Sequence, residues 1–120
     1  MKKILVIEDE KILAEMYKDK LSKEGFKVME AMEVKKALQL TKKEKPDLIV
    51  LDILLPRENG IIFLRKMRSD PEISSIPVVV LSNFDDSLTR KEALDLEVKD
   101  YLIKANLDPK ETVERIKKLL

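Results

Sequence analysis

The sequence predicts an α/β protein with a doubly wound parallel sheet of five strands and five helices. Apolar runs of strand length alternate five times with segments whose apolar residues recur at helical spacing. Such alternation is typical of a parallel sheet with helices on both faces, joined by right-handed crossovers. The length of 120 residues suits one domain, and we expect residues 1–120 to form it without a second domain.

Three of the five predicted strands are continuous apolar runs rich in Ile, Val and Leu. They cover residues 3–7, 47–51 and 77–81. Runs of this kind are expected for strands that are buried on both faces. Residues 26–30 and 99–103 are more mixed, which is typical of strands at the edge of a sheet.

The predicted helices begin and end at recognisable signals. They cover about residues 10–23, 34–44, 58–69, 86–96 and 109–119. Gly25 supplies the stop after the first of them. The last has the clearest start, because Asp108 as N-cap, Pro109 in the first turn and Glu111 three residues after the cap form a capping-box pattern.

The composition excludes several classes of function. The chain has no cysteine, hence no disulfides or thiol chemistry, and no histidine, the usual general base and commonest metal ligand. Its 24 basic and 23 acidic residues give a net charge of +1, which favours neither nucleic acid nor an anionic membrane as a partner. No apolar run approaches membrane-spanning length and no signal peptide precedes the first strand, so we expect a cytoplasmic protein.

Polar side chains directly follow four of the five predicted strands. They are Glu8, Asp9, Asp52, Ser82, Asn83 and Lys104. The carboxyl ends of parallel strands share one edge of the sheet, where open α/β proteins bind their ligands. Three carboxylates at one edge repel one another unless a cation is present, and oxygen ligands suit Mg²⁺. Asp9 and Asp52 could bind it directly, with Glu8 acting directly or through water.

The same edge suits phosphoryl chemistry. An aspartate carboxylate such as Asp52 can act as a nucleophile, and Mg²⁺ beside it would orient an incoming phosphoryl group. Lys104 would neutralise one phosphoryl oxygen and the Ser82 hydroxyl could donate to another. Singly, these residues read as helix-terminal acids, a loop aspartate, a helix cap and a solvated lysine. Their joint occurrence at the strand ends favours the functional interpretation.

On these residues the sequence resembles the receiver domain of two-component response regulators, over essentially the whole chain. Four segments carry the resemblance, in the family's order and at the strand ends: Ile7-Glu8-Asp9, Leu51–Pro56 followed by Gly60, Val80–Asn83, and Asp100–Lys104. The resemblance implies a flavodoxin-like sheet of strand order 2-1-3-4-5.

The resemblance also implies residue roles. Asp52 would accept a phosphoryl group from a sensor histidine kinase or a phosphotransfer protein. Asp9, Asp52 and the backbone carbonyl of Leu54 would bind Mg²⁺, with Glu8 beside them. The protein would be no enzyme, apart from Mg²⁺-dependent self-phosphorylation from a donor and self-dephosphorylation.

The switching residues and the output face follow from the same resemblance. Lys104 would pair with the phosphoryl group, Ser82 would move toward it, and Tyr101 would turn inward behind Ser82. The fourth helix, fifth strand and fifth helix would form the output face, with a phosphorylation-linked homodimer as a family expectation. The output would pass to a separate protein target or to an effector domain missing from this chain.

Three alternatives are weaker. A receiver-like interaction module that is not controlled by phosphorylation would not need the intact acidic set. A flavin carrier would need an anion-binding loop after the first strand, where Glu8, Asp9 and Glu10 stand instead. A magnesium-dependent phosphatase would need a second acid two residues after Asp52, where Leu54 stands.

The chain departs from the family pattern at several positions. Ala105 replaces the usual proline after Lys104, which predicts a trans peptide or a rearranged loop. Glu97 replaces a common glycine, at a cost of roughly 1 kcal/mol if its backbone is left-handed. Val34 likewise replaces a glycine that is common before the second helix. Leu54 and Phe84 are bulky where side chains tune hydrolysis of the phosphoaspartate, which predicts a long-lived phosphorylated state.

Overall fold

Five parallel strands form one sheet in the order β2-β1-β3-β4-β5, which confirms the predicted order. The computed structural model describes all residues from 1 to 120. The strands are β1 (Lys3–Ile7), β2 (Lys27–Ala31), β3 (Leu48–Leu51), β4 (Val78–Ser82) and β5 (Asp100–Ile103). Each lies within one residue of its predicted bounds. The apolar runs that predicted β1, β3 and β4 are also buried segments.

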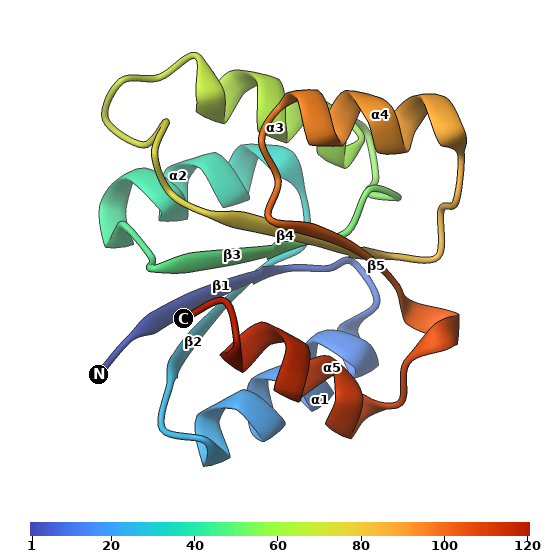
Figure 1. Cartoon of the computed structure of the whole chain (residues 1–120). Helices are drawn as coiled ribbons and strands as arrows, with labels where there is room; N and C mark the ends of the chain where they lie inside the picture. The colour runs from blue at the N-terminus through green and yellow to red at the C-terminus, as the bar shows by residue number, and fades with distance from the viewer.

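Helices cover both faces of the sheet. They are α1 (Lys11–Lys23), α2 (Val34–Glu44), α3 (Gly60–Arg68), α4 (Ser87–Asp95) and α5 (Pro109–Lys117), with a short 3-10 helix η1 (Lys104–Asn106) after β5. Helices α2, α3 and α4 lie on one face, and α1 and α5 lie on the other (Figure 1). None of the helices combines the length and the apolar character that a membrane-spanning segment requires.

The sheet separates two apolar cores. Alternate residues of a strand point to opposite faces, so Leu5 and Ile7 of β1 enter the core beneath α2, α3 and α4. Ile4 and Val6 enter the core beneath α1 and α5. These side chains are at most 1% exposed, so β1 is a rigid base for the polar residues that follow it.

Caps define where several helices begin. Helix α3 begins at Gly60, two residues later than predicted, because Asn59 is the N-cap and its side chain accepts the Ile62 N–H. The predicted capping box at Asp108 is present at the start of α5. Helix α5 ends at Lys117, two residues before its predicted end, because the last residues form tighter i→i+3 hydrogen bonds.

Four residues have a positive φ. Gly25 ends α1 as predicted, with φ +94°. Glu97 is left-handed, with φ +64°, so the condition under which strain was expected at this position is met. Lys45 and Arg57 are left-handed as well, with φ +45° and +69°, which the sequence did not indicate. All peptide bonds are trans, so the Lys104–Ala105 bond is trans and the chain continues into η1.

Candidate functional site

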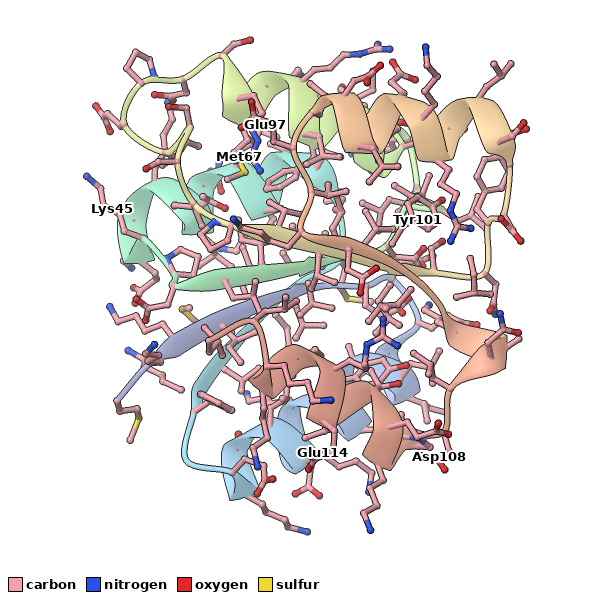
Figure 2. The ribbon with its side chains drawn as sticks, viewed as in Figure 1. Lys45, Met67, Glu97, Tyr101, Asp108 and Glu114 are labelled. Atoms are coloured by element: carbon pink, nitrogen blue, oxygen red, sulfur yellow. The ribbon has the colours of Figure 1, made fainter.

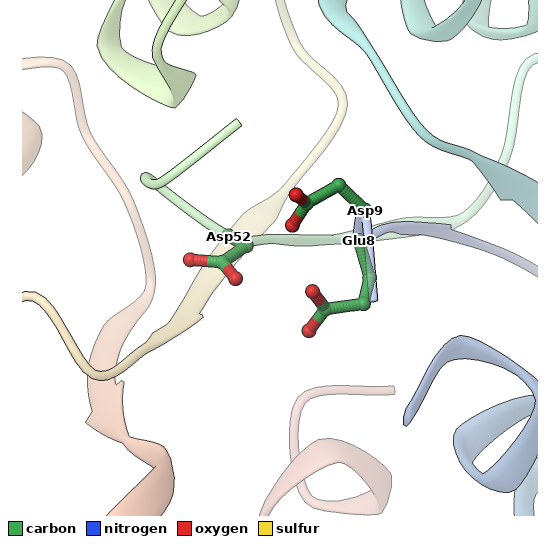
Figure 3. Close-up of side chains that lie close together, drawn as sticks. All are labelled: Glu8, Asp9 and Asp52. Atoms are coloured by element: carbon green, nitrogen blue, oxygen red, sulfur yellow. The ribbon is translucent and has the colours of Figure 1, made fainter. Parts of the chain in front are cut away.

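The three predicted acids meet at the carboxyl edge of the sheet. Ile7 and Leu51 pair across β1 and β3, so Glu8 and Asp52 leave the sheet side by side. Carboxylate oxygens of Glu8, Asp9 and Asp52 lie within 4.8 Å of one another, and Figure 3 shows the three side chains close together. Glu8 and Asp52 are 2% and 5% exposed. The edge therefore holds two buried carboxylates beside a third, more exposed one.

Both oxygens of the Asp52 carboxylate accept hydrogen bonds. The Ser82 hydroxyl donates to Oδ1 at 2.5 Å, and the Leu54 backbone N–H donates to the same oxygen at 3.1 Å. The Lys104 ammonium donates to Oδ2 at 2.7 Å. Hydrogen bonds to an ionised group are shorter and stronger than neutral ones, so this set holds Asp52 in one orientation.

Lys104 also donates to Glu8, which makes it the shared cation of two carboxylates. Burial works against the charge of Lys104, but its hydrogen bonds to Asp52 and Glu8 outweigh this and raise its pKa. Burial raises the pKa of Glu8, although the Lys104 hydrogen bond opposes this. At Glu8 the effect of burial outweighs that of the Lys104 hydrogen bond, so its protonated form is favoured. The raised pKa of Lys104 keeps its ammonium charged.

The acidic cluster suits a hard divalent cation. Glu8, Asp9 and Asp52 offer only oxygen ligands, and one lysine leaves the three carboxylates incompletely neutralised. Mg²⁺ takes few ligands from protein and keeps several waters, and the site opens to solvent. A pocket of about 280 Å³ is lined by Asp9, Glu10, Asp52, Leu54, Asn83 and Lys104.

Ser82 and Tyr101 are connected through Phe84. Ser82 is fully buried and its Oγ accepts the Phe84 N–H at 3.2 Å. The Tyr101 hydroxyl donates to the Phe84 carbonyl at 2.6 Å. Tyr101 is 4% exposed and lies beneath α4 (Figure 2). Phe84 therefore forms hydrogen bonds both with Ser82, whose hydroxyl contacts Asp52, and with the Tyr101 hydroxyl of β5.

Arg90 also belongs to this part of the molecule, and no sequence pattern indicated its role. Its guanidinium lies 5.1 Å from the centre of the Tyr101 ring and pairs with Asp85 at 3.0 Å. A cation over an aromatic face is attracted to it. Burial raises the pKa of the Tyr101 phenol, although the nearby Arg90 charge opposes the shift. The phenol therefore stays a hydrogen-bond donor at neutral pH.

Leu54 and Phe84, the two bulky residues, occupy different environments. The Leu54 side chain is 52% exposed and lines the pocket beside Asp52. Phe84 packs against the core beneath α2, α3 and α4 and does not line that pocket. The structure therefore places Leu54, but not Phe84, where a side chain can cover Asp52.

Asn83 has a contact that the sequence did not indicate. Its side-chain oxygen accepts the Ala105 N–H at 2.8 Å and so joins the loop after β4 to η1. The position of Asn83 after a predicted strand indicated the sheet edge but no partner, since Asn83 and Ala105 are far apart in the chain.

The fold and site define a class of protein: the chain belongs to the response regulator receiver domain family, which matches residues 4–117. One relative is the alkaline phosphatase synthesis transcriptional regulatory protein PhoP of Bacillus subtilis (strain 168). It is 34% identical over 119 residues, which cover 99% of this chain and 48% of PhoP. The chain spans about half the length of the curated relatives it matches.

Two solved structures share the architecture. The BeF3-activated N-terminal receiver domain of Klebsiella pneumoniae RstA has a TM-score of 0.85 and 27% identity, covering 97% of this chain and 96% of that one. The phosphorylated cyanobacterial phytochrome response regulator RcpA has a TM-score of 0.82 and 27% identity, covering 98% of this chain and 90% of that one. Both likenesses extend over nearly the whole chain, so they include every strand end of the site.

Proposed function

We propose that this chain is a phosphoryl-accepting signalling switch whose acceptor is Asp52. The observation that carries the proposal is the environment of that carboxylate, with the Ser82 hydroxyl at 2.5 Å and the Lys104 ammonium at 2.7 Å. A phosphoryl group on Asp52 would bring three oxygens to these two donors. The phosphorylated RcpA and the BeF3-activated RstA domain support the proposal by family likeness.

In the proposed transfer an oxygen of Asp52 attacks the phosphorus of the donor. A P–O bond forms to the carboxylate, and the bond to the donor's leaving atom breaks with its electron pair staying on the donor. Lys104 balances charge on the phosphoryl oxygens, and the Ser82 hydroxyl donates a hydrogen bond to one of them. The donor would be a sensor histidine kinase or a phosphotransfer protein. We also propose that the protein acts in the cytoplasm.

Mg²⁺ is the cation we assign to the acidic cluster. Glu8, Asp9 and Asp52 would hold it, with the backbone carbonyl of Leu54 as a further oxygen ligand. A bound divalent ion stabilises charge on phosphoryl oxygens and orients the reacting group. The chain's own contribution is to gather the carboxylates at one edge and to hold Asp52 in one orientation.

The output face would be α4, β5 and α5. Two contacts join these elements: the Arg90 guanidinium lies over the Tyr101 ring, and Arg115 of α5 pairs with Asp100 of β5 at 2.7 Å. The phosphoryl group carries about −1.5 to −2 charge, compared with −1 for the carboxylate that it replaces. This added charge would pull Ser82 and Lys104 and so alter the loop that Tyr101 contacts. This face would then contact an effector domain or a separate target protein. We also propose that phosphorylation promotes formation of a homodimer.

The test is the intact mass of the protein after incubation with acetyl phosphate, with and without Mg²⁺. We expect one phosphoryl adduct on the wild type with Mg²⁺, and none on Asp52→Asn. A folded wild type without an adduct would favour the second candidate, an interaction module that is not controlled by phosphorylation.

A further inference from the structure

The Asn83 side chain ties two segments together at the carboxyl edge. Ser82 and Ile103 are the last paired residues of β4 and β5, so Asn83 and Lys104 are the first residues beyond the pairing. Oδ1 of Asn83 accepts the Ala105 N–H at 2.8 Å. This hydrogen bond links the segments that follow β4 and β5, beyond the last residues paired in the sheet.

The Lys104 ammonium depends on where η1 lies. Strand β4 separates β5 from β3, so the Lys104 side chain must reach past β4 to contact Asp52. Lys104 is the first residue of η1, and the local bond that closes this turn, from the Leu107 N–H to the Lys104 carbonyl, is 3.3 Å long. Ala105 is exposed, and β5 is an edge strand. A contact from the β4 side is therefore well placed to fix the turn.

Ser82 and Asn83 act on the same site from adjacent positions. The Ser82 hydroxyl contacts Asp52, and the Asn83 side chain contacts the residue that follows Lys104. Asn83 also lines the pocket beside Asp52 and Lys104. One dipeptide thus holds both the acceptor carboxylate and the turn that carries its cation.

We propose that Asn83 is a positioning residue: by accepting the Ala105 N–H, it holds η1 where the Lys104 ammonium reaches Asp52. The role requires an N–H at position 105, which alanine supplies and proline lacks. Its consequence for phosphoryl transfer rests on the proposed function, whereas the hydrogen bond itself can be tested without it.

The hydrogen bond is tested by the exchange rate of the Ala105 amide proton, followed by NMR. One hydrogen bond changes an equilibrium by roughly 2- to 10-fold, so we expect Asn83→Ala to speed this exchange by that factor. Asn83→Asp keeps an acceptor oxygen and should retain the protection. Equal Ala105 exchange in the wild type and Asn83→Ala would overturn the proposal.

The positioning role is tested by the rate of adduct formation from acetyl phosphate with Mg²⁺. We expect Asn83→Ala to slow it roughly 2- to 10-fold at a temperature where both proteins are fully folded. In an Ala105→Pro background, which has no N–H to accept, Asn83→Ala should slow it no further. Asn106→Ala, in the same turn and without a side-chain hydrogen bond, is the matched control and should react like the wild type.

The outcomes separate the two proposals. A wild type that forms no adduct overturns the proposed function. A wild type that reacts at the same rate as Asn83→Ala overturns only the role of Asn83, as does an equal slowing by Asn83→Ala in the Ala105 and Ala105→Pro backgrounds.

Discussion

A Cβ atom on Gly60 would lie 2.5 Å from the carbonyl oxygen of Asp52 and 2.9 Å from Cα of Ile53. The Gly60 N–H also donates to the Ile53 carbonyl at 2.8 Å. The first turn of α3 is therefore packed directly against the backbone of Asp52 and Ile53. Only a residue without a side chain permits this approach, so Gly60 helps to fix where Asp52 lies.

Gly60→Ala should therefore lower both stability and the rate of phosphorylation. Overpacking against backbone costs roughly 1–3 kcal/mol, because either α3 or the Asp52 segment must move. Gly25→Ala is the matched control, since Gly25 has a positive φ but nothing within 4 Å of a Cβ, and it lies before β2 at the other end of the sheet. We expect it to lower stability and leave the phosphorylation rate unchanged. Urea unfolding and adduct kinetics check both, and equal phosphorylation rates in wild type and Gly60→Ala would refute this account.

Lys104→Gln should destabilise the protein in a pH-dependent way. Removing one partner of a buried ion pair costs about 3–5 kcal/mol, here because Glu8 and Asp52 lose their shared cation. The raised pKa of Glu8 means that the folded state binds its proton more tightly than the unfolded chain. Glu8 therefore favours folding at low pH, and this contribution is lost as the pH rises through the raised pKa.

Loss of the Lys104 hydrogen bond removes an influence that lowers the pKa of Glu8. The stability deficit of Lys104→Gln should thus be small near pH ~4, the ordinary range of carboxyl groups, and should grow toward neutral pH. Lys99→Gln, at an exposed lysine without an ion pair, should show little deficit at any pH. Denaturant unfolding of Lys104→Gln across this range checks the slope, and a deficit independent of pH would contradict it.

Mg²⁺ should stabilise the folded protein. A ligand that binds only the folded state contributes about 2.7 kcal/mol at a hundred times its dissociation constant. Asp9→Asn should lose most of the increase in thermal midpoint with Mg²⁺, because it removes one of three clustered carboxylates. Asp19→Asn, at an exposed acid of α1, should keep the full increase. If Asp9→Asn responds to Mg²⁺ like the wild type, the cation site is misassigned.

Leu54→Asn should shorten the lifetime of the phosphorylated state. The Leu54 side chain lines the pocket at Asp52, so a smaller polar residue would admit and orient water there. Phe84→Lys should shorten the lifetime less, because Phe84 packs against the core and does not line the pocket at Asp52. The decay of the adduct after removal of the phosphodonor measures both. Unchanged decay in both variants would rule out shielding by these side chains.

The sequence was sufficient for the strands and for the acidic set. Continuous apolar runs mark buried strands, and in a parallel sheet every carboxyl end reaches the same edge, so Glu8, Asp9 and Asp52 had to converge. The left-handed backbone at Glu97 was considered only as a condition, from the glycine that is common at this position in the family.

Contacts between loops were not predictable in the same way. The Ala105 N–H meets Asn83 across 22 positions of sequence, and Arg68 donates to carbonyls of Ser74, Ile76 and Leu96. Such pairs depend on the conformations of irregular segments, and these conformations leave no periodic pattern in the sequence. The close approach of Gly60 to Asp52 is of the same kind.

Asp52 is the one of three adjacent carboxylates that is proposed to carry the phosphoryl group. The most direct test is reduction of the acyl phosphate with borohydride in wild type phosphorylated with acetyl phosphate and Mg²⁺, followed by peptide mass mapping. We expect homoserine at position 52 and unmodified Glu8 and Asp9. Reduction at Asp9 or Glu8, with an intact aspartate at position 52, would contradict it.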